Sequence, residues 1–148
     1  MKEFEHYVKK GDVKKQKPDG LVSQAVFRDA IDRLAHAKSI LKSAKAKYVL
    51  ENAYESMREA ADALLYNDGY KSCSHEASIV YLVGKGFTAH ELGEFDRFRK
   101  IRNDIKCYGG DCDDTDAKQY IALAEQIINK IRLLLQKQST QGNQTGGG

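Results

Sequence analysis

The feature that most constrains the fold is a regular apolar stripe in the last third of the chain. Apolar residues recur there at intervals of three and four, and they are Ala117, Tyr120, Ile121, Ala124, Ile127, Ile128, Ile131, Leu134 and Leu135. This spacing places them on one face of an α-helix. Because such a face must be buried against other elements, the rest of the chain has to supply matching partners.

Other stretches repeat the same period, and no strand pattern competes with them. We expect helices over residues 22–44, 46–67, 74–83 and 88–107, of which 74–83 is short and almost wholly apolar. We expect the helix with the apolar stripe to start after Asp113, Asp114 or Thr115 and to run to about Gln136. Thr88 and Glu91 have the spacing of a capping box. The chain has a single proline, Pro18, which also favours helices. We predict an all-α fold, an antiparallel up-and-down four-helix bundle with an additional short helix.

The length of 148 residues predicts one domain, with a distinct segment at each end. Residues 1–20 are a lysine-rich N-terminal lead-in. We interpret it as a solvated, flexible segment, and the alternative is an arm that binds nucleic acid. Residues 21–137 form the helical bundle. Residues 138–148 contain only Gln, Ser, Thr, Gly and Asn, so we expect a disordered tail.

Charge and cysteine content limit the classes of function. The net charge of +3 permits anionic partners without requiring them. No apolar run approaches the ~18 residues of a membrane span and no signal peptide opens the chain, so we expect a cytoplasmic protein without a membrane partner. Cys107 and Cys112 have no accompanying histidine, so we expect no metal. Phosphate-binding glycine loops and nucleophile motifs are missing from the sequence, and we expect no cofactor.

One charged residue falls on an apolar helix face. Arg102 shares an arc with Phe95, Phe98, Ile101 and Ile105. A guanidinium group stays charged and is costly to bury without a partner. Its partner could be a carboxylate, for which Glu55 and Glu59 are the candidates, or a subunit interface, or an anionic ligand. Asn103 and Tyr108 could orient a phosphate or a ribose beside it.

Three segments, 51–60, 69–77 and 95–104, resemble the HEPN domain, most closely its small stand-alone prokaryotic members. The resemblance covers roughly residues 22–135. It rests on the Arg102-Asn103 pair near the end of a long helix and on a Tyr-x-Ser-x-Ser-His pattern that ends at His75. It implies a helical bundle, usually a homodimer, in which the arginine of an Arg-x4–6-His motif faces the dimer cleft. Some members cut RNA. Others bind nucleotides or pair with a small nucleotidyltransferase in toxin–antitoxin systems.

The sequence departs from this motif where its histidine should stand, because positions 107 to 109 hold Cys107, Tyr108 and Gly109. Cysteine and tyrosine are poor bases near neutral pH, since their ordinary pKa values are ~8.5 and ~10 against ~6.5 for histidine. The candidate ligand-binding residues are Arg102, Asn103, Tyr108, Tyr54 and His75.

Three hypotheses for the function stay open. The first is a dimeric, non-catalytic module that binds a nucleotide, RNA or a partner nucleotidyltransferase. The second is a metal-independent endoribonuclease, with Arg102 and Asn103 as candidate catalytic residues and Tyr108 or His75 in the role of the missing histidine. The third is a purely structural dimerisation module in which Arg102 forms a salt bridge in the core.

Overall fold

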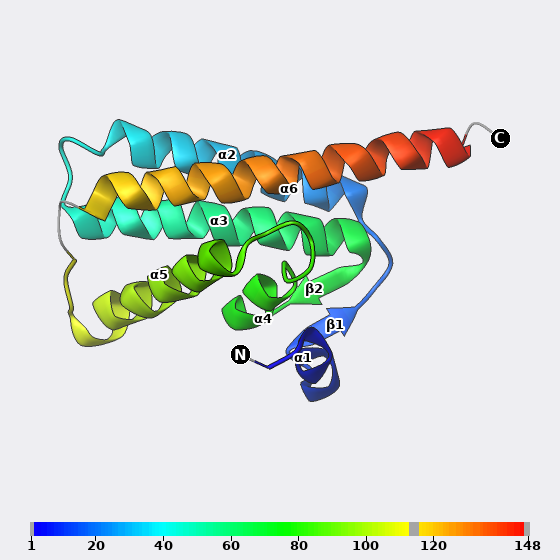
Figure 1. Ribbon diagram of the computed structural model, residues 1–148, viewed down its shortest axis with the longest axis horizontal. Helices are drawn as coiled ribbons and strands as arrows, with labels where there is room; N and C mark the ends of the chain where they lie inside the picture. Colours follow the sequence, from blue (N-terminus) through cyan, green and yellow to red (C-terminus); the bar gives the residue numbers. More distant parts are fainter. Residues whose placement is uncertain (1, 113–115, 147–148) are drawn as a thin grey trace.

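The structure of the protein is a computed structural model that describes residues 2–112 and 116–146, with side chains as far as residue 138 (Figure 1). The long helices are α2 (Gly20–Ser39), α3 (Ala46–Asp68), α5 (Ala89–Tyr108) and α6 (Ala117–Gly146). Figure 1 shows that each of them runs opposite to the one before it. The short elements are α1 (Phe4–Lys10), β1 (Val13–Lys15), β2 (Tyr70–Ser72) and α4 (His75–Val80). The prediction of an all-α fold is confirmed.

Helix α3 lies at the centre and contacts α2, α5 and α6. Its buried face includes Ala53, Ala60 and Ala61, which are completely buried. Such small side chains let the neighbouring helices pack closely against it. Larger side chains fill the remaining space: the rings of Phe98 on α5 and Tyr120 on α6 meet edge to face, with their centroids 4.7 Å apart. This packing fixes the position of α5, and with it the position of Arg102.

The helix boundaries follow local signals in the sequence. The side chain of Asp19 caps α2 by accepting a hydrogen bond from the backbone N–H of Val22. Thr88 and Glu91 form the expected capping box at the start of α5. Helix α2 ends at Ser39, earlier than the expected residue 44, and a turn separates it from α3.

The N-terminal segment is folded against the rest of the chain, which corrects our interpretation of it as solvated and flexible. Tyr7 on α1 and Val13 on β1 are buried, and β1 pairs antiparallel with β2, with Val13 opposite Ser72. The fold therefore includes a second short helix. It also includes a two-stranded sheet, which we did not expect. A strand of three residues is too short to show a period in the sequence, and the partners of this segment lie more than 50 residues further along.

At the other end, α6 continues through Gly146, so the backbone is helical over most of the segment for which we expected disorder. A helix that has already formed extends at little cost, and no proline interrupts this one. Residues 113–115, where we placed the start of this helix, and residues 147–148 lie outside the described part. Among the helices described, none combines the length and the apolar character that crossing a lipid bilayer requires.

Candidate functional site

Arg102 connects α5 to α3 through an ion pair. Its Nη2 atom lies 3.0 Å from Oε1 of Glu55, and the two side chains are 18% and 12% exposed. Glu55 is one of the two partners that the sequence suggested. The other, Glu59, instead accepts a hydrogen bond of 2.8 Å from Nε of Arg33 on α2. The arginine on the apolar arc therefore meets a carboxylate of its own chain.

A second guanidinium group shares the same carboxylate. Arg58, one turn along α3, donates from Nε and Nη2 to Oε2 of Glu55 at 3.0 and 2.8 Å. Its Nη1 atom donates to Asp62 at 2.8 Å, and Asp62 in turn accepts a hydrogen bond from the hydroxyl of Ser78. Burial alone would raise the pKa of Glu55, but the hydrogen bonds and charges of Arg58 and the charge of Arg102 lower it. Glu55 is therefore held as a carboxylate between two arginines.

The side chain of His75, the first residue of α4, lies in the same region as Arg102. Its Nδ1 atom lies 2.8 Å from the hydroxyl of Tyr54, whose side chain is completely buried. The guanidinium carbon of Arg102 lies 5.7 Å from the centroid of the Tyr54 ring. Burial lowers the pKa of His75, and the positive charges of Arg58 and Arg102 lower it further, against the opposing charge of Glu55. The imidazole is therefore neutral at neutral pH.

A third arginine, Arg99, links α5 to α4 through an ion pair. Arg99 donates from Nε to Asp96 at 2.8 Å and from Nη2 to Glu76 at 3.1 Å. Glu76 also accepts a hydrogen bond from the hydroxyl of Tyr7 on α1 at 2.7 Å. Burial and this hydrogen bond raise the pKa of Tyr7 to about 12.

We name the group formed by Tyr54, Arg58, His75, Arg99 and Arg102 the arginine junction. Sequence reasoning did not single out Arg58 and Arg99. The signal that could have found Arg58 is its spacing, since it follows Glu55 by three residues and precedes Asp62 by four, so that all of them share one side of a helix.

Three buried side-chain polar atoms lack hydrogen-bond partners in the part of the chain that the structure describes. They are Nε of Arg102 in the arginine junction, Oε1 of its partner Glu55, and Oε2 of Glu59. The contact between Arg102 and Glu55 is thus a charge pair whose atoms are not aligned for a hydrogen bond. Because buried polar groups in folded proteins almost always have partners, this pair is an unusual feature.

Not all predicted site residues meet at the arginine junction. Tyr54, His75 and Arg102 do, and Asn103 follows Arg102 on α5 and is partly buried. Tyr108 is 84% exposed at the last residue of α5. Six residues after Arg102, it points to a different side of the helix, since each residue turns by roughly 100°. The geometry therefore assigns Tyr108 no contact with Arg102.

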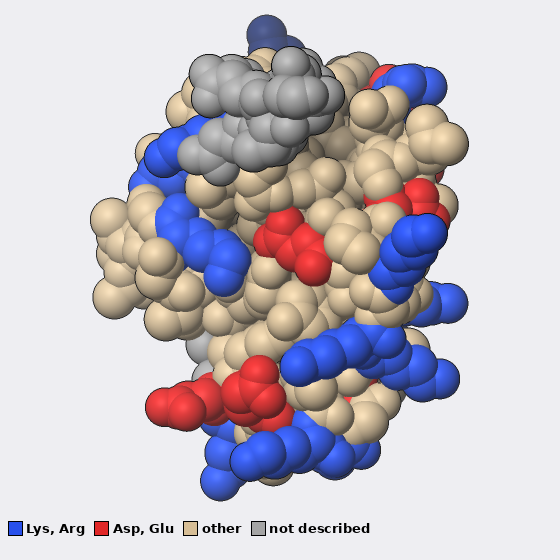
Figure 2. Space-filling view, turned by 90° about the vertical axis from the view of Figure 1, so that its right-hand side faces the viewer, with Lys and Arg blue, Asp and Glu red and all other residues tan. Residues whose placement is uncertain are grey.

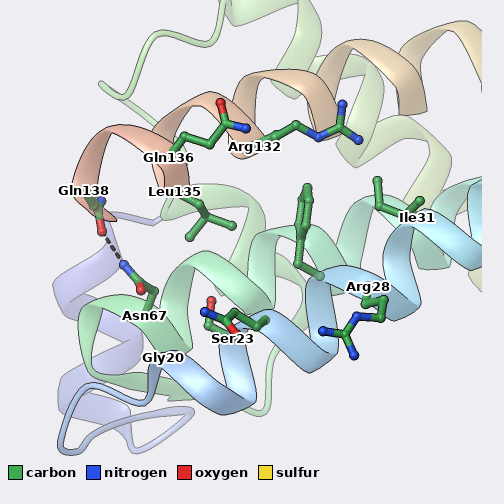
Figure 3. A pocket seen from close by; sticks show the side chains of 11 residues that line it. Gly20, Ser23, Arg28, Ile31, Asn67, Arg132, Leu135, Gln136 and Gln138 are labelled. Atoms are coloured by element: carbon green, nitrogen blue, oxygen red, sulfur yellow. Dashed lines mark hydrogen bonds between the residues drawn. The ribbon is translucent and has the colours of Figure 1, made fainter. Parts of the chain in front are cut away.

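One hollow in the surface lies away from the arginine junction. A groove of about 790 Å³ runs between α2 and α6, and Phe27, Ile31, Arg132 and Leu135 are among the residues that line it (Figure 3). The hydrogen bond between the side chains of Asn67 and Gln138 lies at one end of this groove. No residue of the arginine junction lines it.

Metal binding finds no support in the described residues, among which no group of three or more His, Cys, Asp or Glu side chains is arranged to hold an ion. Comparison of the chain with models of known protein families finds none that matches, and comparison with curated proteins finds no match either.

Proposed function

We propose that the chain is a HEPN-like domain that binds RNA or a nucleotide through the arginine junction. One observation carries the proposal: Nε of Arg102 and Oε1 of Glu55 are buried side by side, each without a hydrogen-bond partner. A phosphate group offers several acceptor oxygens, and a guanidinium can donate two parallel hydrogen bonds to it. Such a ligand would satisfy the donors of Arg102 that Glu55 leaves free.

The shared carboxylate makes this exchange feasible. If a phosphate oxygen takes the place of Glu55 beside Arg102, Glu55 keeps its two hydrogen bonds from Arg58. No carboxylate is then left buried and unpaired, which would be the main cost of displacing it. Tyr54 and neutral His75 lie beside Arg102 and supply polar atoms without adding negative charge.

The resemblance to HEPN domains adds two proposals about partners. One is a homodimer, in which two copies of Arg102 would approach each other across a cleft. The two guanidinium groups would repel each other unless an anion or carboxylates lie between them. A phosphate-bearing ligand would supply this negative charge where it takes the place of Glu55. The other is a small nucleotidyltransferase that pairs with this chain as in toxin–antitoxin systems.

Two arginine substitutions on the same helix test the site. Arg102→Ala removes the proposed ligand contact, whereas Arg97→Ala removes an exposed arginine that pairs with Glu94 on its own helix. We expect Arg102→Ala to weaken binding of single-stranded RNA or ATP by about tenfold or more, since hydrogen bonds from charged groups contribute about 1.5–3 kcal/mol. Arg97→Ala should bind as the wild type does.

The result that contradicts the proposal is equal binding by both variants, with the helical circular dichroism spectrum preserved. If Arg102→Ala then also unfolds at a lower denaturant concentration, the structural module becomes the better account. The ion pair of Arg102 with Glu55 is the observation that favours that account.

A second candidate function is metal-independent cleavage of RNA with His75 as the base. The observation in its favour is the neutral imidazole, oriented by the Tyr54 hydroxyl and close to Arg102. The protein would be incubated with mixed RNA in the presence of a chelator, beside His75→Ala and the exposed-site control His36→Ala. Cleavage that is lost only in His75→Ala supports this function, and equal cleavage by all three preparations excludes it.

A further inference from the structure

The small sheet places two lysines directly opposite each other. In the antiparallel register of β1 and β2, Lys14 pairs with Lys71, and both side chains are exposed. Side chains opposite each other in such a sheet have Cβ atoms about 4.5–5.5 Å apart, and like charges there are destabilising. The fold therefore keeps an unfavourable pair that a neutral residue at either position would remove.

More positive charge surrounds this pair. Lys15 and Lys17 follow Lys14 along the chain and are also exposed. We name Lys14, Lys15, Lys17 and Lys71 the lysine cluster. Figure 2 looks onto the end of the molecule where Figure 1 places β1 and β2, and it shows Lys and Arg side chains over the lower half of that face, with a group of Asp and Glu side chains at its lower left.

The lysine cluster has no counter-charge of its own. Among the described residues, no acidic side chain forms an ion pair with any of its members. Lysines elsewhere in the chain do have such partners, for example Lys106 with Glu51 and Lys130 with Glu91.

The backbone beneath the lysine cluster is fixed. Val13 is buried at 1% exposure. The N–H of Gln16 donates to the carbonyl of Gly69 at 2.9 Å, and the N–H of Cys73 donates to that of Asp12 at 2.8 Å. The backbone that carries Lys14, Lys15 and Lys71 is therefore ordered before any ligand arrives, which lowers the entropic cost of binding.

We propose that the lysine cluster binds the phosphate backbone of single-stranded RNA, on a surface separate from the arginine junction. Lysines bind phosphates as point charges and release the counterions condensed on the nucleic acid. A membrane surface is the less favoured partner, because peripheral binding also uses exposed apolar side chains. The exposed large apolar residues among those described are Leu21, Val22, Tyr48, Val83, Tyr108 and Leu133, and none of them belongs to α1, β1 or β2.

This inference goes beyond the proposed function, since it does not require Arg102. The test compares two triple variants. The cluster variant is Lys14→Gln/Lys15→Gln/Lys71→Gln, and the matched control is Lys42→Gln/Lys45→Gln/Lys118→Gln. The control removes the same charge from exposed lysines near the α2–α3 turn and the start of α6, at the opposite end of the molecule. Both variants have the same net charge, so a difference between them reports the location of binding.

The measurement is the dissociation constant for labelled single-stranded RNA over a range of NaCl concentrations. Each phosphate contact contributes about −0.7 to the slope of log K against log salt, so loss of three contacts should make the slope shallower by about 2. We expect this change, with binding about tenfold weaker or more at low salt, only in the cluster variant. The triple arginine variant Lys14→Arg/Lys15→Arg/Lys71→Arg, which keeps the charge, should bind like the wild type.

Equal slopes for the cluster variant and the control would overturn the proposal. So would binding to vesicles of anionic phospholipid with none to RNA. A third contrary result is aggregation of the cluster variant with unchanged RNA binding, because the lysines would then only protect the sheet edges from pairing. Arg102→Ala separates this proposal from the proposed binding at the arginine junction. In that variant, the part of the salt dependence of RNA binding that comes from the lysine cluster should persist.

Discussion

The hydroxyl of Tyr54 and Nδ1 of His75 lie 2.8 Å apart, and this contact joins the middle of α3 to the first residue of α4. It brings a neutral histidine beside Arg102, although the two residues are 27 positions apart in the sequence. The motif that the sequence resembles places its histidine after the arginine on the same helix. Here the fold supplies an imidazole from another helix, which is why His75 has to be tested alongside Arg102.

Removal of the Tyr54 hydroxyl should destabilise the protein. In Tyr54→Phe the ring stays in the core, but Nδ1 of His75 loses its partner, and we expect unfolding to become about 1 kcal/mol easier. Urea denaturation followed by circular dichroism measures this change. The matched control is Tyr48→Phe on the same helix, where the side chain is 49% exposed and little change is expected. An equal stability of both variants would show that the Tyr54–His75 contact contributes nothing to the fold.

Stability should fall when the solution becomes mildly acidic. The pKa of His75 is lowered in the folded state, so the folded protein resists protonation that the unfolded chain accepts near its ordinary pKa of about 6.5. The contribution of neutral His75 to stability is therefore fully present above the pKa of the unfolded chain. It is lost as the pH falls through the lower pKa of the folded state. Denaturation at a series of pH values should show a smaller acid loss in His75→Gln than in the wild type. His90→Gln, at an exposed position, should follow the wild type.

Neutralising the shared carboxylate separates binding from structure. Glu55→Gln leaves Arg102 and Arg58 without their common counter-charge, and we expect a loss of about 2–3 kcal/mol in the free energy of unfolding. If the arginine junction binds phosphate, the same variant should bind RNA or ATP more tightly, because the competing carboxylate has been removed. Calorimetric titration of the variant measures the affinity. Weaker binding by Glu55→Gln in a protein that is still folded would argue against the proposed site. The control is Glu94→Gln, which removes the carboxylate of the ion pair between Glu94 and Arg97 on α5.

The opposed lysines predict a stabilising substitution. Lys71→Gln removes the repulsion with Lys14, and we expect a gain of roughly 0.2–1 kcal/mol at low ionic strength. The gain should shrink in high salt, because exposed charges are screened. Thermal unfolding at two salt concentrations measures both effects, with Lys42→Gln as the control. A loss of stability in Lys71→Gln would mean that the lysine stem packs usefully against the sheet.

Local signals predicted the helices well, because the groups that form a cap lie within one turn of each other. The capping box of Thr88 and Glu91 is such a case. Arg102 was recognised by its place on an apolar arc. Glu55 and Glu59 were the candidate carboxylate partners, beside the alternatives of a subunit interface and an anionic ligand. The choice between Glu55 and Glu59 depends on the tertiary packing, which brings Arg33 of α2 to Glu59.

The sequence did not reveal features made by distant segments. Val13 looks like an isolated apolar residue in a lysine-rich stretch, and the partners of Tyr7 and Val13 on β2 and α4 lie far along the chain. Arg99 resembled a surface residue on a charged helix until the fold placed Glu76 beside it. Neither contact has a period or a spacing that a single sequence could show.

The attachment of the first 15 residues has a consequence for the order of folding during synthesis. Elements α1 and β1 contact each other, α4 and β2, and buried Tyr7 and Val13 pack with Ala77 and Val80. The chain emerges from its N-terminal side first, so β2 leaves the ribosome only with residues 70–72 and α4 only with residues 75–80. Elements α1 and β1 are therefore made before the elements on which they pack, and they complete their contacts only after α3 and α4 have been made. Until then the lysines of this segment are carried on an unpaired strand.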